Sequence, residues 1–403
     1  MNQRDMRPPF AALGGTIPPE LEKLPTPCYL LDEAVLTRNA EILGGLAQRT
    51  GCKVLLAQKA FSNYDCYPLL APYLAGTEAS GLFEARLGAE EMPGKEVHVF
   101  CAAYRADEMD ELVQYADHIV FNSPAQLAKF GPAAKAAGKS VGLRINPECS
   151  TQDGHAIYDP CAPGSRLGTT RAQWNAAVAA NPALPNLLDG LHFHTLCEQD
   201  SDALATTLDA VAQKFGDLLP RMQWLNFGGG HHITRPGYDI ATLERCITRA
   251  QQDWGVTVYL EPGEACALNA GFLLSRVLDV VQNGDTTIAI LDASAACHMP
   301  DVIEMPYRPP LFAAAEPGEK PCTVRLAGPT CLAGDVIGDY GVDAVPNVGD
   351  LLVFGDMAIY TTCKNNTFNG MPLPAIFARA ASGTTRSIVS FGYEDFKYRL
   401  GKR

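Results

Sequence analysis

Between Lys53 and Glu261 the chain repeats one pattern of apolar and polar positions. A short apolar run ends in a polar or glycine-rich turn, and an amphipathic stretch with helical periodicity follows. The apolar runs are residues 54–57, 74–77, 97–101, 118–121, 141–145, 188–194, 224–227 and 256–260. Such an alternation of eight strands with helices predicts a (β/α)8 barrel. A doubly wound open sheet is the alternative, but the G-x-G-x-x-G motif expected after its first strand is missing.

Two serines mark helix starts within this pattern. Ser123 stands directly before Pro124, which is the order of an N-cap residue and a proline at the first helical position. Ser201 is a plausible cap for a later helix. The predicted helices include residues 107–116, 124–137, 201–219 and 240–254.

After about residue 270 the helical periodicity stops. Apolar runs at residues 272–281, 286–291, 323–326, 350–354 and 388–391 are separated by Gly, Pro and Asp turns, which predicts a mainly β domain. Residues 26–31 form one more candidate strand that could join it. We therefore predict an N-terminal arm and strand over residues 1–30, the barrel over residues 31–268 and a C-terminal β domain over residues 269–403.

The charge and the composition restrict the partners and the compartment. The 403 residues include 32 Lys and Arg against 45 Asp and Glu, a formal net charge of -13. An acidic surface repels phosphate backbones, so we expect no nucleic-acid partner, whereas a cationic small molecule would suit it. The sequence contains no apolar run of about 18 residues, so we predict no membrane span, and the N-terminus has no apolar signal core. We expect a cytoplasmic protein.

The 13 cysteines contain no C-x-x-C or C-x-C pair, which argues against a zinc knuckle or a thioredoxin-type motif. Their spread fits reduced, mostly buried thiols. We predict no metal site.

Polar residues gather where the predicted barrel strands end, which is where barrel enzymes place their catalytic groups. They are Lys59 after the first strand, Arg144 at the end of the fifth, His192 and His194 in the sixth, Gly228–Gly230 after the seventh, and Glu261 and Glu264 after the eighth.

Lys59 follows an apolar strand, so its amine would lie in a poorly solvated barrel mouth. Desolvation and nearby cations lower the pKa of an amine and make it a nucleophile toward carbonyl groups. The alternative is a lysine whose ammonium extends to solvent.

The other strand ends offer further binding groups. Gly228–Gly230 is a candidate backbone site for a phosphate, although a flexible turn explains it as well. His192 and His194 are two residues apart and face the same side, inward, where an aromatic stacking role for one of them is favoured over a metal site. Glu261 would be buried and would need a protonated partner, such as a pyridine nitrogen or a neighbouring arginine.

These groups suit one cofactor. Pyridoxal phosphate needs a lysine for its aldehyde, a phosphate site, a partner for its ring nitrogen and a group against its ring face. Lys59, Gly228–Gly230, Glu261 and His194 can supply these four functions in that order.

A set of motifs then resembles a known family. They are LLAQKAFS, SRLG, GLHFHTLCEQ, NFGGGHH, LEPGEA, LDASAACHMPD, GPTCLAGD and FGDMAIYT, spread in order over residues 53–362. The sequence resembles the fold-type III pyridoxal-phosphate decarboxylases, whose fold is alanine racemase-like, and within them the carboxynorspermidine and carboxyspermidine decarboxylases. The resemblance implies decarboxylation of carboxynorspermidine or carboxyspermidine to the polyamine.

The resemblance also implies roles for individual residues. Lys59 would bind the cofactor covalently, His194 would stack on its ring, and Glu261 would hold the ring nitrogen protonated. Gly229, Gly230 and the hydroxyl of Tyr360 would bind the phosphate. Cys331 is similar to a catalytic cysteine that reaches the substrate from the neighbouring subunit of a homodimer, so active sites shared across that interface are implied.

Two departures from relatives bear on the substrate. Relatives that act on ornithine or diaminopimelate carry arginine where this chain has Glu264, and the diaminopimelate enzymes carry glutamate where it has Leu332. An acid in place of a cation favours a substrate with a cationic tail. Glu264, Asp301 and Asp335 are our candidates for holding that tail, and Arg144 could support either the cofactor or the head group of the substrate.

Three alternatives remain at this stage. A non-catalytic relative that binds the cofactor or a polyamine would be expected to lack Lys59 or Cys331. A racemase of the related fold commonly pairs the ring nitrogen with arginine, which Glu261 argues against. A decarboxylase for diaminopimelate or ornithine is less favoured because of Glu264 and Leu332.

Overall fold

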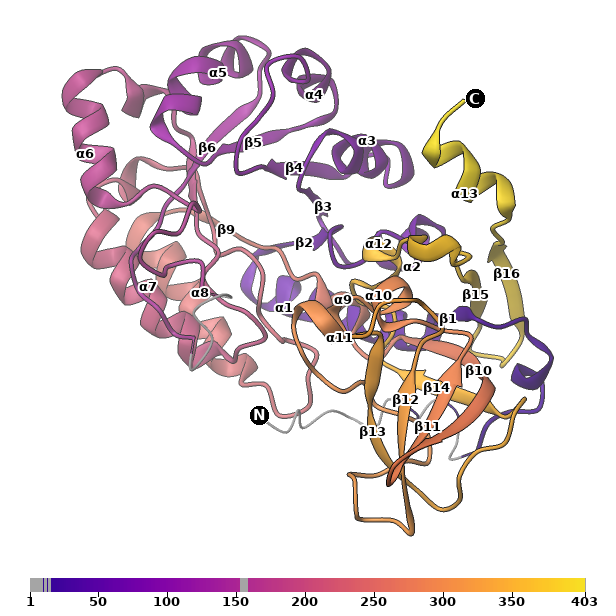
Figure 1. Ribbon diagram of the computed structural model, residues 1–403. Helices are drawn as coiled ribbons and strands as arrows, with labels where there is room; N and C mark the ends of the chain where they lie inside the picture. Colours follow the sequence, from indigo (N-terminus) through magenta and orange to yellow (C-terminus); the bar gives the residue numbers. More distant parts are fainter. Residues whose placement is uncertain (1–9, 11–12, 14–15, 153–158, 403) are drawn as a thin grey trace. The chain divides into compact units, whose positions relative to one another are not determined.

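The structure is a computed structural model that describes residues 10, 13, 16–152 and 159–402 (Figure 1). Most of the predicted N-terminal arm therefore lies outside the described residues. By compactness the chain forms two units. The sheet unit comprises Met1–Arg38, Ala60–Asp65 and Ala267–Arg403, and the barrel unit comprises Asn39–Lys59 and Cys66–Cys266. The domain boundaries after residues 30 and 268 stay a prediction from the sequence.

The barrel unit contains a closed barrel of eight parallel strands, which confirms the predicted fold class. Its strands in order are β2 (Lys53–Ala57), β3 (Gly76–Ala79), β4 (Glu96–Phe100), β5 (His118–Phe121), β6 (Ser140–Arg144), β7 (Gly190–His192), β8 (Trp224–Asn226) and β9 (Thr257–Leu260). The last strand closes the barrel on the first, because Lys53 pairs with Tyr259 and Val54 with Leu260.

Helices precede, connect and follow these strands (Figure 1). They are α1 (Glu33–Thr50), which begins in the sheet unit, α2 (Tyr67–Leu70), α3 (Leu82–Glu91), α4 (Met109–Tyr115), α5 (Pro124–Ala136), α6 (Arg171–Ala180), α7 (Ser201–Phe215), α8 (Ile240–Trp254) and α9 (Glu264–Ala267). Short 3-10 turns occupy Tyr64–Cys66, Leu184–Leu187 and Leu219–Arg221.

The helix caps show how local sequence sets these boundaries. The Ser123 side chain accepts a hydrogen bond from the amide of Gln126 at 3.3 Å, which confirms it as the N-cap of α5. The expectation for Ser201 was wrong, because Asp200 is the N-cap of α7. The Asp200 carboxylate accepts the amide of Ser201 at 2.7 Å, and Ser201 Oγ donates to the carbonyl of Asp239.

The sheet unit is built on one eight-stranded sheet, as the pattern after residue 270 predicts. Its strands are β1 (Cys28–Asp32), β10 (Gly271–Asn283), β11 (Thr286–Leu291), β12 (Cys322–Ala327), β13 (Val336–Val342), β14 (Leu351–Gly355), β15 (Ala375–Arg379) and β16 (Thr385–Val389). The order is β13-β12-β11-β10-β1-β15-β16, and β14 pairs with β10. Short helices complete this unit, namely α10 (Ala295–His298), α11 (Asp301–Glu304), α12 (Thr361–Lys364), α13 (Tyr393–Leu400) and 3-10 turns at Leu21–Lys23 and Phe368–Gly370.

Strand β1 lies inside the sheet, although it comes from the start of the chain. It pairs antiparallel with β10 and parallel with β15, and all five of its residues are buried. Strand β10 is long because its first half pairs with β1 and β14, and its second half extends along β11. Burial changes with the partner, since the first half is buried and most of the second half is exposed.

A tryptophan fills the barrel interior, and two glycines make room for it. Trp224 packs in a core with Leu55, Val120 and Tyr259. A Cβ added at Gly142 would lie 2.3 Å from the Trp224 ring, and one added at Gly190 would lie 2.0 Å from it.

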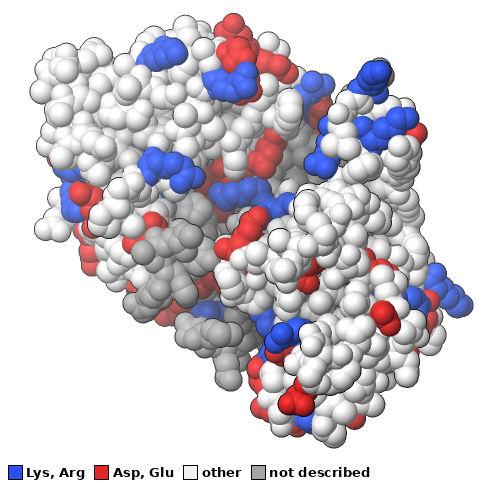
Figure 2. Space-filling model, viewed as in Figure 1, with Lys and Arg blue, Asp and Glu red and all other residues white. Residues whose placement is uncertain are grey.

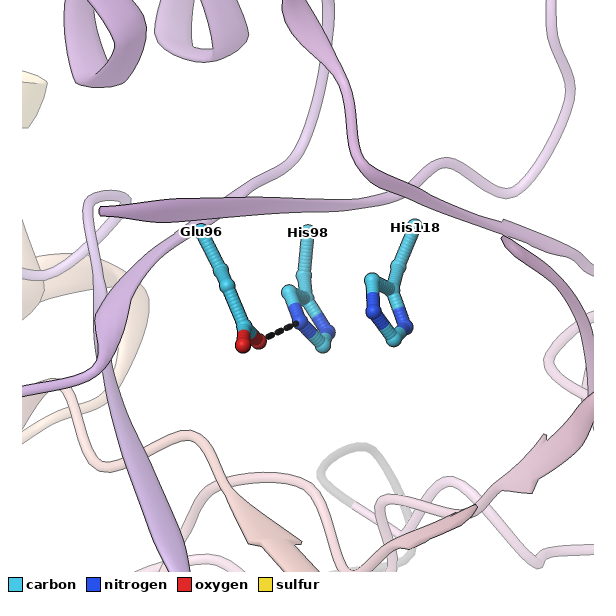
Figure 3. A group of neighbouring side chains, drawn as sticks. All are labelled: Glu96, His98 and His118. Carbon is cyan, nitrogen blue, oxygen red and sulfur yellow. Dashed lines mark hydrogen bonds and ion pairs between the residues drawn. The ribbon is translucent and has the colours of Figure 1, made fainter. Parts of the chain in front are cut away.

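The first half of each of β2, β4 and β5, together with Tyr259 of β9, carries a polar group on the barrel floor. Figure 3 shows its core, Glu96, His98 and His118, whose ligand-type atoms lie within 4.8 Å of one another. The two imidazoles stack with ring centroids 3.9 Å apart. Glu96 accepts hydrogen bonds from His98 Nε2 at 3.1 Å and from the Tyr259 hydroxyl at 3.0 Å, and its other oxygen pairs with Lys53.

These contacts satisfy the Glu96 carboxylate, whose charge the Lys53 ammonium balances. Nδ1 of His98 and Nδ1 of His118 are buried without a hydrogen-bond partner among the described residues. The prediction of no metal stays a prediction.

On the face drawn in Figure 2, acidic and basic side chains of the described residues are interspersed and leave wide uncharged areas. Several charges are paired, among them Arg171 with Asp217 and Arg325 with Asp339, each through two hydrogen bonds. None of the helices in the described part of the chain combines the length and the apolarity that a membrane crossing requires.

We predict that Gly190→Ala destabilises the protein. The new methyl group would overlap the Trp224 ring in a packed barrel, so the free energy of unfolding should fall by about 1–3 kcal/mol. Chemical denaturation measures the change. Gly45→Ala is the matched control, because Gly45 lies in α1 and a Cβ there would meet only the flexible end of Arg49, at 3.1 Å. That control should be neutral or stabilising, and equal losses in both variants would contradict the packing argument.

We also predict that His118 makes the fold sensitive to mild acid. Burial, with a contribution from His98, lowers the pKa of His118 to about 3 from an ordinary value of 6.5. The unfolded chain therefore binds a proton below pH 6.5 that the native state refuses, so stability falls as the pH drops from 6.5 toward 3. The His118→Phe variant keeps a stacking ring and should lose less Tm between pH 7 and pH 5 than the wild type. Identical pH profiles would refute this assignment.

Candidate active site

The carboxyl ends of the barrel strands bring the predicted polar residues into one part of the barrel unit. Lys59 follows β2, Glu78 lies in β3, Arg144 ends β6, His192 ends β7, Asn226 ends β8 and Glu261 follows β9. Arg144 pairs with His192 across β6 and β7, and His192 with Asn226 across β7 and β8. Residues paired in this way project from the same side of the barrel wall.

Lys59 lies beside a buried acid that the sequence analysis missed. Its Nζ is 3.6 Å from Oε2 of Glu78, whose side chain is 1% exposed. Burial raises the pKa of Glu78 to about 8, an effect that Lys59 opposes and the charge of Glu261 reinforces. Burial therefore favours the protonated form of Glu78 beside the lysine amine.

Glu261 is held by two donors. Its Oε2 is 3.0 Å from His192 Nε2, and its Oε1 accepts a hydrogen bond from Asn226 Nδ2 at 2.6 Å. Both His192 and Glu261 are almost fully buried. Burial alone would raise the pKa of Glu261, but the interactions with His192 and Lys59 outweigh it and lower the pKa below its usual range. The acid is therefore an anion that retains acceptor capacity for a further cation.

The glycine segment forms a close turn after β8, the seventh barrel strand. Gly228 and Gly230 have φ values of 70° and 80°, where glycine is favoured. A Cβ at Gly229 would lie 2.6 Å from the carbonyl oxygen of Glu261 and 3.2 Å from the ring of His194. The Gly229 amide also approaches His194 Nδ1 at 3.4 Å. The turn thus leaves backbone without side chains beside His194, which is the arrangement that lets amides approach a phosphate closely.

His194 and Arg144 are linked through the backbone. Arg144 is buried, and its Nη2 donates to the carbonyl oxygen of His194 at 3.0 Å. Burial lowers the pKa of Arg144 to about 10, so it remains a cation at neutral pH. Burial, with the nearby charges of Lys59 and Arg144, also holds the pKa of His194 well below 6.5. A neutral imidazole is suited to stack against a cationic ring.

In the sheet unit, Tyr360 and Cys331 lie in different loops. Tyr360 has a φ of 58°, in the left-handed region, and its amide donates to the carbonyl of Ala60 at 2.8 Å. Ala60 is the neighbour of Lys59 in the chain. Cys331 is exposed, and its amide donates to Asn369 Oδ1 at 2.7 Å. Their roles at the phosphate and at the substrate stay predictions.

Asp335 organises the loop that carries Cys331. Its Oδ1 accepts from Ser294 Oγ at 2.9 Å and from the amide of Ala296, and its Oδ2 accepts from the hydroxyl and the amide of Thr330. With four donors inside its own unit, this buried carboxylate has a structural role that the sequence did not indicate. Binding of a substrate amine by Asp335 stays a prediction.

The other two candidates for the cationic tail lie at helix starts. Asp301 is the first residue of α11, and Lys364 pairs with it and with Glu304. Glu264 is the first residue of α9 and is partly exposed. An amine that bound Asp301 would have to share it with Lys364. Binding of the substrate tail by Asp301 and Glu264 stays a prediction.

The donor set of the barrel unit fits pyridoxal phosphate. The amine beside a buried acid suits the aldehyde of that cofactor, and the neutral imidazole suits its ring face. The anionic acid with remaining acceptor capacity suits its ring nitrogen, and the glycine turn suits its phosphate.

Curated proteins of similar sequence span nearly the whole chain. The chain is 44% identical to the carboxyaminopropylagmatine decarboxylase of Synechocystis sp., over 95% of this chain and 97% of that protein. It is 41% identical to the carboxynorspermidine/carboxyspermidine decarboxylase of Campylobacter jejuni, over 94% of this chain and 99% of that protein.

A solved structure has the same fold. The carboxynorspermidine decarboxylase of Campylobacter jejuni, crystallised with norspermidine, superposes with a TM-score of 0.84 at 39% identity, covering 93% of this chain and 100% of that one. The family model described as "Pyridoxal-dependent decarboxylase, C-terminal sheet domain" matches residues 28–358. The chain therefore belongs to the pyridoxal-dependent decarboxylases.

Proposed function

We propose that this decarboxylase acts on a carboxylated polyamine, releasing CO2 from carboxynorspermidine or carboxyspermidine to form norspermidine or spermidine. The observation that carries the proposal is the placement of Lys59 beside Glu78 in a barrel that also holds the His192–Glu261 pair. The polyamine substrate is supported by relatives that are 35–41% identical and carry that activity in their names.

Each group in the barrel unit has a role in this proposal. When bound, pyridoxal phosphate supplies the electron sink for loss of the carboxylate. Lys59 provides the amine that attaches to its aldehyde, and Glu78 takes up or returns the proton of that amine. Glu261 accepts the N–H of the ring and keeps the ring cationic. His194 would lie against the ring, and the amides of Gly229 and Gly230 would bind the phosphate.

The remaining roles lie in the sheet unit. Tyr360 supplies a hydroxyl to the phosphate. Cys331, which is exposed on its loop, supplies a proton to the substrate carbon in the neighbouring subunit of a homodimer, or Lys59 does so. Glu264, Asp301 and Asp335 provide negative charge for the amines of the tail, and Arg144 supports the cofactor or the head group. A cytoplasmic location stays a prediction from the sequence.

Carboxyaminopropylagmatine is a second candidate substrate, because the relative that is 44% identical is named for it. Its tail ends in a guanidinium group, whereas the tail of carboxyspermidine ends in an ammonium group. Acidic side chains attract both tails, and the planar guanidinium additionally favours a carboxylate that accepts two parallel hydrogen bonds.

Lys59→Ala should abolish activity and the absorbance at about 420 nm that is expected of the lysine-bound cofactor. Lys53→Ala is the matched control, because Lys53 lies at the opposite end of the same strand, β2, on the barrel floor. Absorbance spectra and CO2 release measure both effects. The assignment fails if Lys59→Ala retains both signals.

A CO2-release assay should identify the substrate. We expect carboxyspermidine, carboxynorspermidine or carboxyaminopropylagmatine to give a kcat/KM at least about tenfold above that for diaminopimelate or ornithine, which corresponds to ~1.4 kcal/mol of discrimination. The polyamine proposal is wrong if diaminopimelate or ornithine is turned over best.

A further inference from the structure

We propose that His192 is a positioning residue, which fixes the Glu261 carboxylate and keeps it anionic so that it can hold the ring nitrogen of the cofactor in its protonated form. This inference rests on the proposed role of Glu261. It concerns a side chain that the sequence analysis placed in the barrel and to which it assigned no function.

The first argument is the geometry of the carboxylate. One N–H donor serves each of its oxygens, His192 Nε2 at 3.0 Å from Oε2 and Asn226 Nδ2 at 2.6 Å from Oε1. A carboxylate offers roughly four acceptor positions, so two positions remain. The side chain of Glu261 is thus held from both sides and can still accept the N–H of a pyridinium ring.

The second argument is the location of the protons. His192 is 1% exposed, and its Nδ1 is buried without a hydrogen-bond partner among the described residues. A doubly protonated ring would bury a charged N–H group at that nitrogen without an acceptor, which is unfavourable because the group loses its hydrogen bonds to water and gains none in the protein. The neutral tautomer with its proton on Nε2 satisfies the contact with Glu261 and leaves Nδ1 as a bare acceptor.

The charge balance follows from this tautomer. Burial lowers the pKa of His192, although the negative charge of Glu261 opposes the shift. A neutral imidazole beside an anionic carboxylate leaves one net negative charge on the pair, and a pyridinium nitrogen can neutralise it. If His192 carried a second proton, the pair would be neutral and the ring nitrogen would lose its counter-charge.

The third argument is how the imidazole is held. Phe100, at the end of β4, stacks on the His192 ring with centroids 5.4 Å apart and planes 18° from parallel. The guanidinium of Arg144 lies 4.5 Å from the centroid of the same Phe100 ring. Arg144 also donates from Nη2 to the carbonyl oxygen of His194. The imidazole of His192 is therefore held by the ring of Phe100, and His192 and Asn226 each donate a hydrogen bond to the Glu261 carboxylate.

Two substitutions separate hydrogen bonding from packing. His192→Leu removes the N–H donor and keeps an apolar side chain, whereas His192→Gln places an amide N–H near the position of Nε2. If His192→Leu fails to fold, His192→Asn replaces it, because its amide is too short to reach Glu261. Thermal unfolding of the apoprotein identifies variants with a native fold.

The test measures binding of two probes, pyridoxal phosphate and its 1-deaza analogue, which has carbon in place of the ring nitrogen. We expect His192→Leu to weaken binding of pyridoxal phosphate by about tenfold, or ~1.4 kcal/mol, and His192→Gln to restore most of it. Binding of the deaza analogue should be the same in all folded variants. In 15N NMR of ring-labelled cofactor, His192→Leu should move the nitrogen resonance toward that of unprotonated pyridine, and His192→Gln should not.

The outcomes are decisive in both directions. If the deaza analogue loses affinity in parallel with pyridoxal phosphate, or if Leu and Gln behave alike, His192 has only a packing role and the inference is overturned. Failure of the proposed function is recognised separately. In that case Lys59→Ala would retain the cofactor absorbance and Glu261→Gln would leave the ring-nitrogen resonance unchanged.

Discussion

An ionised carboxylate in the interior of a barrel is unstable unless donors surround it, and this constraint governs the barrel unit. Glu261 is 2% exposed, so water cannot supply those donors. His192 and Asn226 supply them from the two preceding strands. The parallel pairing that aligns the ends of β7 and β8 is what places both donors beside β9. The chemistry of the site thus depends on strand register as much as on residue type.

Two acids in the same barrel mouth respond to this environment in opposite ways. Burial raises the pKa of Glu78, whose Oε2 has no hydrogen-bond donor among the described residues and lies 3.6 Å from the Lys59 ammonium. Glu261, which accepts from two N–H donors, has a lowered pKa. In many enzymes two neighbouring acids have different pKa values, so that one transfers a proton and the other stays ionised and stabilises charge. Here the acid beside the lysine can carry a proton, and the acid beside His192 keeps its negative charge.

The barrel was predictable because eight repeats of one period leave little ambiguity, and Lys59, His194 and Glu261 stood out as polar residues at strand ends. Glu78 was missed because the predicted run ended at residue 77, whereas β3 continues to Ala79 and includes it. Strand β13 was missed because Gly and Asp interrupt its apolar positions. Strand β15 was missed because it has only four apolar residues, Ala375–Ala378, before Arg379. Contacts such as those of Asp335 join residues far apart in the sequence, so local patterns carry no sign of them.

Strand β1 has one more consequence. Its parallel neighbour β15 begins at Ala375, near the end of the chain, and its antiparallel neighbour β10 begins at Gly271. During synthesis the ribosome therefore releases this apolar segment long before either partner exists, and the whole barrel emerges in between. The sheet can close only after β10 and β15 have both emerged, so a nascent or shortened chain that ends before β15 would expose an unpaired, aggregation-prone edge of β1.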